Sequence, residues 1–265
     1  MVETSMKAFI RKYWKILLFF AVIGLAGGFF TGLYMLDSYP AEIRQQLLDE
    51  LNTSGLGMFS ADILMGVIAA AQSAGYGLLL GAAGIFLGKK TGLWKDEKTI
   101  TKKPLIIAAT ISVIGGMALI LPDMLLFGKL SQVIMDSYAA KPTVPYMLAA
   151  VLYGGVIEEV MLRLFMMSLV AFILHKLFGK KTEKPSTGIL IAANIVAAVL
   201  FAAGHLPATA ALMGLTPMLI FRCFLLNGGF GLLFGWLYRK YGLRYAMIAH
   251  GGCHVVSKLI WILFI

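Results

Sequence analysis

Residues 16–36 read ILLFFAVIGLAGGFFTGLYML, a run of apolar and small side chains that contains no charged residue. At 1.5 Å of rise per residue, a helix of this length crosses a hydrocarbon core of about 30 Å. Six further long, mostly apolar runs follow at 63–87, 105–127, 144–174, 189–204, 217–238 and 245–265. Because the runs do not alternate in polarity, they favour helices over the strands of a membrane barrel. The sequence therefore predicts an all-α, polytopic transmembrane helical bundle with about seven spans.

The composition agrees with lipid as the solvent of this chain. Of the 265 residues, 60% are hydrophobic and 14% charged, and the mean hydropathy is +0.86. A water-soluble domain of this composition would expose far too much apolar surface. Connections between the runs are short, which predicts one membrane domain over 1–265. Glycines four residues apart, at 24, 28 and 32, predict close helix packing inside it.

The net charge of +10 follows membrane topology and does not indicate a nucleic-acid partner. Seventeen Lys and Arg residues lie in one set of connections, the segments 1–15, 89–103, 176–184 and 239–244. The alternating connections contain only Arg44, Lys129 and Lys141. The positive-inside rule then predicts a multi-pass protein of the cell membrane, with a cytoplasmic N-terminus and an external C-terminus.

Ionisable side chains inside or beside the later runs mark the candidate site. They are Glu158, Glu159 and Arg163 in the fourth run, His205 just after the fifth, and His250 and His254 in the seventh. A charged side chain at the centre of a membrane helix costs about 2.5–3.5 kcal/mol on insertion scales. Such residues are therefore candidates for function, and the motif-bearing core is expected at 144–265.

Helical geometry separates the roles of the two adjacent carboxylates. At about 100° per residue, Glu159 and Arg163 lie about 40° apart around a helix, whereas Glu158 and Arg163 lie about 140° apart. Glu159 is thus expected to pair with Arg163, which leaves Glu158 to meet groups from other helices. The alternative, a purely structural ion network of all three, explains Glu159 and Arg163 better than Glu158.

The two histidines of the seventh run lie one turn apart on one helical face. Taken alone, His250 and His254 would be interpreted as neutral imidazoles bonded to backbone carbonyls. Because His205 and the glutamate pair also lie in or beside the later runs, a shared site is favoured. A buried carboxylate can take a proton from water, and imidazole N–H groups can stabilise an oxyanion, which suits peptide hydrolysis. The same side chains are also familiar zinc ligands. The cofactor therefore stays open, either none or a divalent metal such as zinc.

Three motifs in the same order resemble a known family. EExxxR reads here as Glu158-Glu159-x-x-x-Arg163, FxxxH reads as Phe201-x-x-x-His205, and a third motif begins at His250. Together they resemble the CPBP family, the CAAX-protease and bacteriocin-processing (Abi) intramembrane proteases, over about 154–254. The third motif in that family is HxxxN or HxxxD, whereas this chain carries His254 at its last position.

The resemblance implies an intramembrane endopeptidase in which Glu158 and His205 activate water. His250 and the residue at the position of the family asparagine, here His254, would support the oxyanion. An imidazole can donate one hydrogen bond as an amide does, but it can also bind metal or become charged. Both a glutamate-type and a metal-dependent mechanism therefore remain open.

The same resemblance leaves Glu159 and Arg163 with structural roles in support of the site. The implied substrate is a peptide or protein in the membrane, of the prenylated or leader-peptide type. Two other functions stay open on the residues alone. One is a non-enzymatic bacteriocin-immunity or partner-binding membrane protein with a degenerate site. The other is a haem-binding electron carrier that uses His205 with His250 or His254.

The depths of the candidate residues conflict on ideal helices. His250 lies about 9 Å from Arg244 along its helix, whereas Glu158 lies about 27 Å from Lys176. If the two groups meet, the fourth helix extends well beyond the membrane, or the spans are tilted or broken near their paired glycines.

Overall fold

The computed structural model describes residues 2–39, 41–55, 60–96, 99–179 and 182–265. Lys98, Lys180 and Lys181, which belong to the basic segments counted in the sequence, lie outside the described residues. Every regular element of the described part is a helix. The all-α class predicted from the apolar runs is therefore confirmed.

The elements include both α-helices and π-helical segments, the latter labelled η and bonded from residue i to i+5. The first half of the chain forms α1 (Val2–Ser38), α2 (Ala41–Thr53), α3 (Ala61–Gly75), η1 (Tyr76–Leu80), α4 (Gly81–Thr91), α5 (Lys102–Pro122), η2 (Asp123–Phe127), α6 (Gly128–Leu130) and α7 (Gln132–Ser137). The second half forms α8 (Val144–Ala149), η3 (Ala150–Glu158), η4 (Val160–Met167), α9 (Ser168–Phe178), α10 (Thr187–Gly204), α11 (Leu206–Met213), α12 (Pro217–Cys223), η5 (Phe224–Gly228), α13 (Gly229–Tyr241) and α14 (Leu243–Phe264).

Six helical segments of the described chain are long and apolar enough to cross a membrane. They are Met6–Leu36, Ala61–Thr91, Lys102–Leu130, Thr187–Met213, Pro217–Tyr241 and Leu243–Phe264. Each contains one of the predicted spans almost whole, and each is longer than or close to the predicted run. The chain is therefore an integral multi-pass membrane protein.

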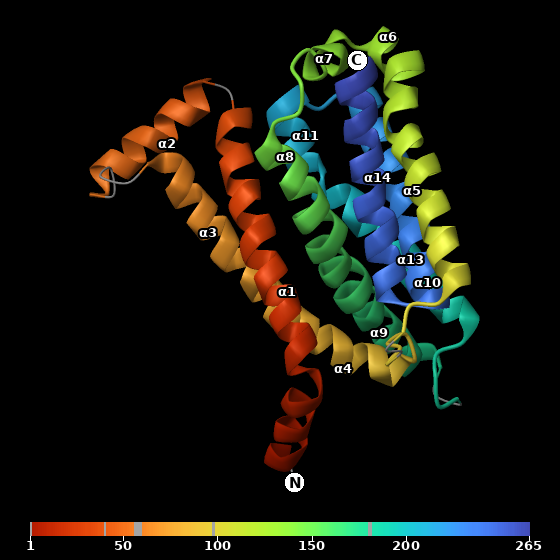
Figure 1. Cartoon of the computed structure of the whole chain (residues 1–265). Coiled ribbons are helices and arrows are strands. Elements are labelled where there is room, and N and C mark those ends of the chain that lie inside the picture. The colour runs from red at the N-terminus through yellow and green to blue at the C-terminus, as the bar shows by residue number, and fades with distance from the viewer. Residues whose placement is uncertain (1, 40, 56–59, 97–98, 180–181) are drawn as a thin grey trace.

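The remaining predicted span, 144–174, is also helical but of a different kind. Residues 144–178 form one uninterrupted helical segment, of which η3 and η4 make up the middle. The chain's two ends lie at opposite ends of the bundle (Figure 1). The six apolar helices together with the segment 144–178 are consistent with the predicted number of about seven spans.

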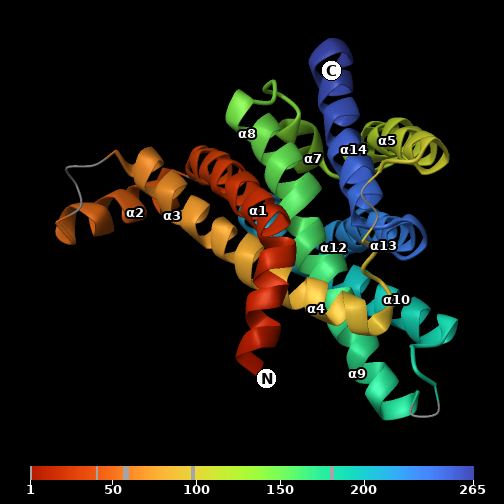
Figure 2. The ribbon, with the colours of Figure 1, turned by 60° about the horizontal axis from the view of Figure 1, so that its bottom comes forward.

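The helices form two flanks around this segment. Helices α1 and α3 lie side by side on one flank, and α5, α13 and α14 lie on the other (Figures 1 and 2). Between them runs the continuous segment from α8 to α9, which contacts α1 through η3 on one side and α14 on the other. The residues of the first motif thus lie at the centre of the bundle.

The outer faces of the helices are apolar, as lipid contact requires. In α1, the side chains of Leu18, Val22 and Leu25 are about half exposed, and Leu79 on η1 is 73% exposed. No more than a third of the residues in any of the six hydrophobic windows are buried inside the protein. In water these surfaces would drive aggregation, whereas hydrocarbon tails cover them without cost.

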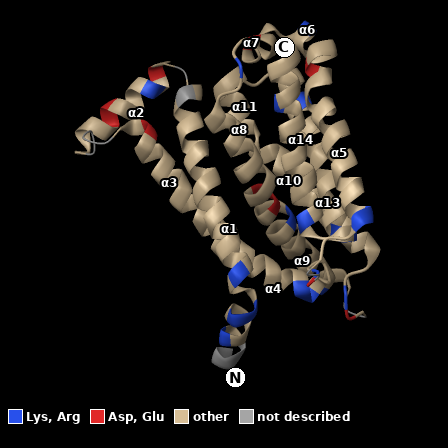
Figure 3. Cartoon of the chain, viewed as in Figure 1, with Lys and Arg blue, Asp and Glu red and all other residues tan. Residues whose placement is uncertain are grey.

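The basic side chains gather toward one end of the bundle. Figure 3 shows blue positions around the start of α1 and near α4 and α9, whereas acidic positions stand out on α2 at the other end. This is the distribution that the positive-inside rule uses. The assignment of the basic end to the cytoplasm stays a prediction.

The glycine stripe of α1 determines how closely α3 approaches it. A Cβ atom on Gly24 would lie 2.6 Å from the carbonyl oxygen of Ser73, and Gly28 and Gly32 meet the α3 backbone in the same way. Lipid provides no hydrophobic force between helices, so close backbone contact supplies the packing energy instead. The stripe read from the sequence is therefore the α1–α3 interface.

We predict that Gly24→Ala loosens this interface. The added methyl group has no room, and overpacking of this kind costs about 1–3 kcal/mol. Thermal unfolding in detergent micelles should show a lower midpoint than wild type. Gly75→Ala is the matched control, since nothing lies within 4 Å of a Cβ there. An unchanged midpoint for Gly24→Ala would show that the α1–α3 contact is not close-packed.

Candidate functional site

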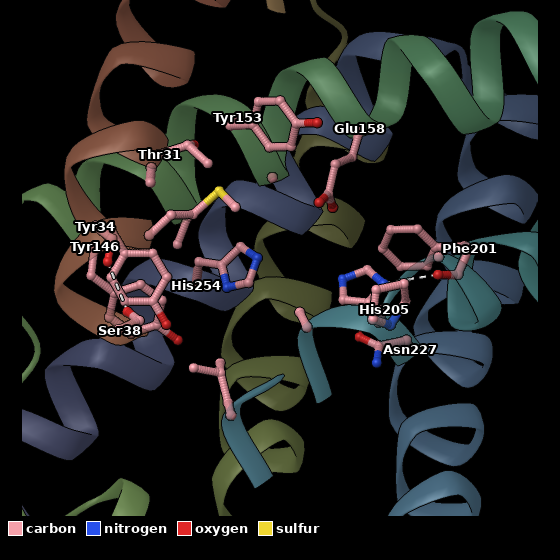
Figure 4. Close-up of a pocket in the computed structure, with 18 of the residues that line it drawn as sticks. Thr31, Tyr34, Ser38, Tyr146, Tyr153, Glu158, Phe201, His205, Asn227 and His254 are labelled. Atoms are coloured by element: carbon pink, nitrogen blue, oxygen red, sulfur yellow. Dashed lines mark hydrogen bonds between the residues drawn. The ribbon is translucent and has the colours of Figure 1, made fainter. Parts of the chain in front are cut away.

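Side chains from three distant parts of the chain meet at the centre of the bundle. Glu158 ends η3, His205 follows the last residue of α10, and His254 lies in the middle of α14. Figure 4 shows these three side chains around one cavity. The three motifs therefore form one site, although about 100 residues of chain separate the first from the last.

Two glycines allow the first and third motifs to meet. A Cβ atom on Gly155 in η3 would lie 2.7 Å from the Cα atom of Gly251 in α14, so the two backbones are in contact. Both helices continue unbroken through these residues. The first and third motifs thus meet where two continuous helices cross, and the fourth helix extends to the end of α9.

The first motif lies in a π-helical stretch, where the sequence predicted an ordinary α-helix. Residues 150–158 and 160–167 are π-helical. Such turns are rare and occur often at functional sites. No residue propensity distinguishes a π-helix from an α-helix, so this departure was not readable from the sequence. The expected pairing of Glu159 with Arg163 is nevertheless present.

Glu159 is the centre of a buried ionic cluster. Its side chain is 0% exposed, and its Oε2 atom lies 3.4 Å from Nε of Arg163, whose side chain is 1% exposed. Its Oε1 atom lies 2.9 Å from Nδ1 of His250. A buried carboxylate needs such partners, because its desolvation is otherwise uncompensated. Glu159 thus joins η4 to α14.

Arg163 extends the same cluster to two further helices. Its Nη2 atom donates to the carbonyl oxygen of Gly231 in α13 at 3.4 Å. Its guanidinium carbon lies 4.5 Å from the ring centroid of Phe201 in α10 and 5.7 Å from that of Phe234 in α13. Cation–π contacts of this kind strengthen when they are removed from water. Arg163 therefore organises the walls of the site without lining the cavity.

His250 lies behind Glu158 and is nearly buried, with 5% of its surface exposed. Its ring stacks on Phe234 at a centroid distance of 4.6 Å. Its Nδ1 atom faces Glu159, and its Nε2 atom lies 3.9 Å from Oε2 of Glu158. Both ring nitrogens therefore face carboxylates.

Glu158 presents its carboxylate to the cavity. Its side chain is 19% exposed, and it lines the cavity together with Tyr153 and Gly154. Among the described residues its ionic contact is His250, at a distance longer than a hydrogen bond. Glu158 and Glu159 are thus adjacent in sequence but lie in different environments, one open to the cavity and one neutralised in the core.

His205 is held in one orientation by its own helix. Its Nδ1 atom lies 2.8 Å from the carbonyl oxygen of Phe201, one turn earlier (Figure 4). A carbonyl oxygen only accepts, so Nδ1 carries the proton, and in the neutral ring Nε2 is left as an acceptor. The Phe201 ring packs against the imidazole at a centroid distance of 4.7 Å. The FxxxH motif thus fixes the tautomer of His205.

His254 lines the same cavity from α14. A Cβ atom on Gly154 would lie 3.1 Å from Nε2 of His254, so this glycine leaves space for the imidazole. Its Nδ1 atom is buried without a hydrogen-bond partner among the described residues. The rings of His254 and His250 are 5.0 Å apart. His254 therefore has spare hydrogen-bonding capacity beside Glu158.

The cavity has a volume of about 760 Å³ and reaches well beyond the motif residues. Asn227 also lines the cavity, and its side chain lies near His205 (Figure 4). The sequence analysis did not single out this residue. The sequence feature that could have identified Asn227 is an uncharged polar side chain inside an apolar span. The size of the cavity is typical of a site for a small molecule or a short peptide segment.

Aromatic side chains line the far end of the cavity from Glu158. Tyr34 and Tyr146 stack at a centroid distance of 4.4 Å, and Trp261 lies 6.2 Å from Tyr146. Two cations, Arg222 and Lys258, also line the cavity there. The walls of this end are therefore largely aromatic, and two cationic side chains lie among them.

A buried ion pair closes the cavity wall at Arg222. Its Nε atom donates to Oδ1 of Asp123 at 2.6 Å, and the Tyr138 hydroxyl donates to Oδ2 at 2.8 Å. Burial, together with the adjacent carboxylate, raises the pKa of Tyr138 well above its usual range, so the hydroxyl keeps its proton. The charge of Arg222 is thus neutralised locally.

The described residues do not form a metal site. No group of three or more His, Cys, Asp or Glu side chains among them is arranged to hold one ion. Two of the imidazole nitrogens have protein partners: Nδ1 of His205 is bonded to the carbonyl of Phe201, and Nδ1 of His250 to Glu159.

Comparison with protein families identifies the second half of the chain. Residues 140–256 match the family described as type II CAAX prenyl endopeptidase Rce1-like. The match covers all three motifs and excludes the helices from α1 to α7. No curated protein and no solved structure matches the chain. The resemblance to CPBP proteases noted from the motifs is thereby confirmed.

We predict that Arg163→Met strongly destabilises the protein. The substitution leaves the Glu159 carboxylate buried without its cation, and breaking a buried ion pair in this way costs about 3–5 kcal/mol. Lys176→Met on the exposed end of the same helical segment is the control, expected to change stability by less than about 0.5 kcal/mol. Unfolding midpoints in detergent micelles give the comparison.

The double variant Glu159→Leu/Arg163→Met should be more stable than Arg163→Met alone, because it removes both charges. A double variant that is less stable than the single variant would contradict the assignment of Glu159 and Arg163 as one ionic unit.

Proposed function

Because residues 140–256 match the Rce1-like CAAX endopeptidase family, we propose that the protein hydrolyses peptide bonds of membrane-associated substrates with water activated by Glu158 and His205. The whole chain acts as one membrane unit, with 144–265 as the catalytic core. The expected substrates are prenylated-type or leader-type peptides that reach the site within the bilayer.

One observation carries the proposal. The Glu158 carboxylate and the His205 imidazole line the same cavity, and each has a proton-accepting atom that no side chain of the described residues occupies. Glu158 directly precedes Glu159, which the buried cluster holds in place, and His205 is oriented by the carbonyl of Phe201. Held acceptors of this kind are what general-base catalysis requires.

The proposed reaction begins with a water molecule between these two residues. Glu158 takes its proton while the oxygen attacks the carbonyl carbon of the scissile peptide, and His205 orients the water through Nε2. The product is a tetrahedral intermediate with a negative oxygen. The proton held by Glu158 then passes to the amide nitrogen, the C–N bond breaks, and an acid and an amine leave. Base catalysis of this type contributes about 10²- to 10⁴-fold to the rate.

The negative oxygen of the intermediate needs a hydrogen-bond donor. We assign this role to His254, which lines the cavity beside Glu158 and stands at the position where the family has asparagine. His250 supports the site from behind through its contacts with both glutamates. In a cavity surrounded by apolar side chains a fixed donor of this kind acts strongly, because little water competes with it.

The first test is cleavage of a fluorogenic peptide panel by the protein in detergent. Glu158→Gln and His205→Ala should each lower kcat/KM by about 10²- to 10⁴-fold, because each removes a group that activates water. Glu183→Gln, on an exposed loop outside the cavity, is the control for removal of a carboxylate and should behave as wild type. Activity should not change with a strong chelator.

Other outcomes of that assay have definite meanings. Activity lost with chelator and restored by zinc would establish a metal-dependent enzyme in place of the glutamate mechanism. Absence of turnover in folded wild-type protein, across the panel, would refute the endopeptidase and favour an immunity or partner-binding role with a degenerate site.

A second prediction concerns the departure from the family pattern. We expect His254→Asn to keep activity within about tenfold of wild type, because the amide also donates one hydrogen bond, and His254→Ala to lose about 10²- to 10³-fold in kcat. The comparison is made on one peptide at saturating concentration. Equal activity of His254→Ala and wild type would remove His254 from the reaction.

A further inference from the structure

Asn227 places an amide side chain inside an apolar span, on the wall of the cavity. It lies in η5, and Figure 4 shows its side chain beside the imidazole of His205. An amide has two donor N–H groups and an oxygen that accepts two hydrogen bonds. Lipid tails offer neither donors nor acceptors, so protein, water or a ligand must satisfy these groups.

The protein satisfies a small part of this hydrogen-bonding capacity. Among the described residues, the Asn227 side chain makes one hydrogen bond, from Nδ2 to Sγ of Cys223 at 3.4 Å. A thiol sulfur is a weak acceptor, and this sulfur also faces the carbonyl oxygen of Ala202 in α10 at 3.3 Å. The second N–H group and the oxygen of the amide are therefore available to a ligand in the cavity.

Asn194 in α10 shows the contacts of an amide that serves helix packing. Its Nδ2 atom donates to the carbonyl oxygen of Leu232 in α13 at 2.9 Å, and its buried Oδ1 atom occupies the space that a Cβ on Gly235 would need. Asn194 does not line the cavity. Polar side chains between membrane helices often hold the helices together in this way. Asn227, bonded to a thiol and open to the cavity, has different surroundings that packing does not explain.

The chain on both sides of Asn227 is fixed in position. Arg222, five residues earlier, donates to Oδ1 of Asp123 at 2.6 Å. On the other side, a Cβ atom on Gly228 would lie 3.7 Å from Cβ of Ala202, so η5 packs closely on α10. Residues 224–228 are π-helical, a form that occurs often at functional sites. An amide held in this way can bind a ligand with little loss of conformational entropy.

We infer that Asn227 binds a backbone peptide group of the substrate next to the scissile bond, donating a hydrogen bond to its carbonyl and accepting one from its N–H. The inference rests on the proposed function. An amide side chain and a peptide group are complementary, since each has a donor and an acceptor. Extended chain advances about 3.3 Å per residue, so a peptide group adjoining the one attacked at Glu158 and His205 lies within reach of Asn227.

The test uses one fluorogenic peptide and two ester analogues. In each analogue an ester oxygen replaces the N–H of one of the two peptide groups that flank the scissile bond. Wild type should lose about tenfold in kcat/KM with one of the analogues, mainly through KM, because one hydrogen bond is lost. Asn227→Leu should cleave the unmodified peptide about tenfold less efficiently than wild type and should distinguish it from that analogue by less than about twofold.

Two results of this assay would overturn the inference. One is full activity of wild type on both analogues, which requires no variant to interpret. The other is an equal loss of activity on all three peptides in Asn227→Leu, which would assign the side chain to the positioning of His205.

Asn194→Leu is the matched control, because it removes the same amide group from a neighbouring span outside the cavity. This variant should lower the unfolding midpoint in detergent, since the carbonyl of Leu232 loses its donor, and should keep the wild-type preference for the unmodified peptide. Asn227→Leu should unfold near the wild-type midpoint. Loss of the preference in Asn194→Leu as well would show that it depends on packing and would overturn the inference.

A binding measurement separates the inference from the proposed function. Glu158→Gln should bind the unmodified peptide about tenfold more tightly than the sensitive analogue, and Glu158→Gln/Asn227→Leu should bind both equally. A binding preference of this kind without any cleavage by wild type would refute the endopeptidase alone. Cleavage by wild type without any preference among the three peptides would refute the role of Asn227 alone.

Discussion

The Glu159 carboxylate, buried between Arg163 and His250, is the interaction on which the rest of the site depends. A charge removed from water and lipid alike is stable only while its partners stay in contact with it. This requirement brings η4 against α14 and, through Arg163, against α13. Gly155 and Gly251 allow the approach, because any side chain at their contact would separate the two backbones.

The buried cluster also explains how two adjacent glutamates acquire different chemistry. Glu159 is neutralised in the core, so Glu158 faces the cavity with a carboxylate free of direct hydrogen bonds within the described residues. The same residues connect to His205, since the Phe201 ring lies against the guanidinium of Arg163 while its carbonyl holds the imidazole. The orientation of the cavity side chains and the packing of the helices therefore use one set of contacts.

The cavity has opposite charge at its two ends. Glu158 supplies negative charge near the helix crossing, and Lys258 supplies positive charge near the stacked tyrosines. One face of α14 carries three of these groups, His250, His254 and Lys258, which are spaced four residues apart.

The sequence by itself determined the all-α membrane class, the apolar runs and the motif residues of the candidate site. The physical reasons for this are local. The length of an apolar run is enough to predict a membrane helix. The free-energy cost of a charged side chain in lipid indicated that Glu158, Arg163 and the histidines lie together. The Glu159–Arg163 pair followed from four-residue spacing.

Only the tertiary structure decided the position and the contacts of each of those groups. The π-helical form of η3 and η4, the place of His250 behind Glu158, and the cavity that joins Asn227 and Lys258 to the motifs all arise from contacts between helices distant in sequence. Residue propensities and spacing carry no information on such contacts, because each depends on which helix faces which and on how closely two backbones approach.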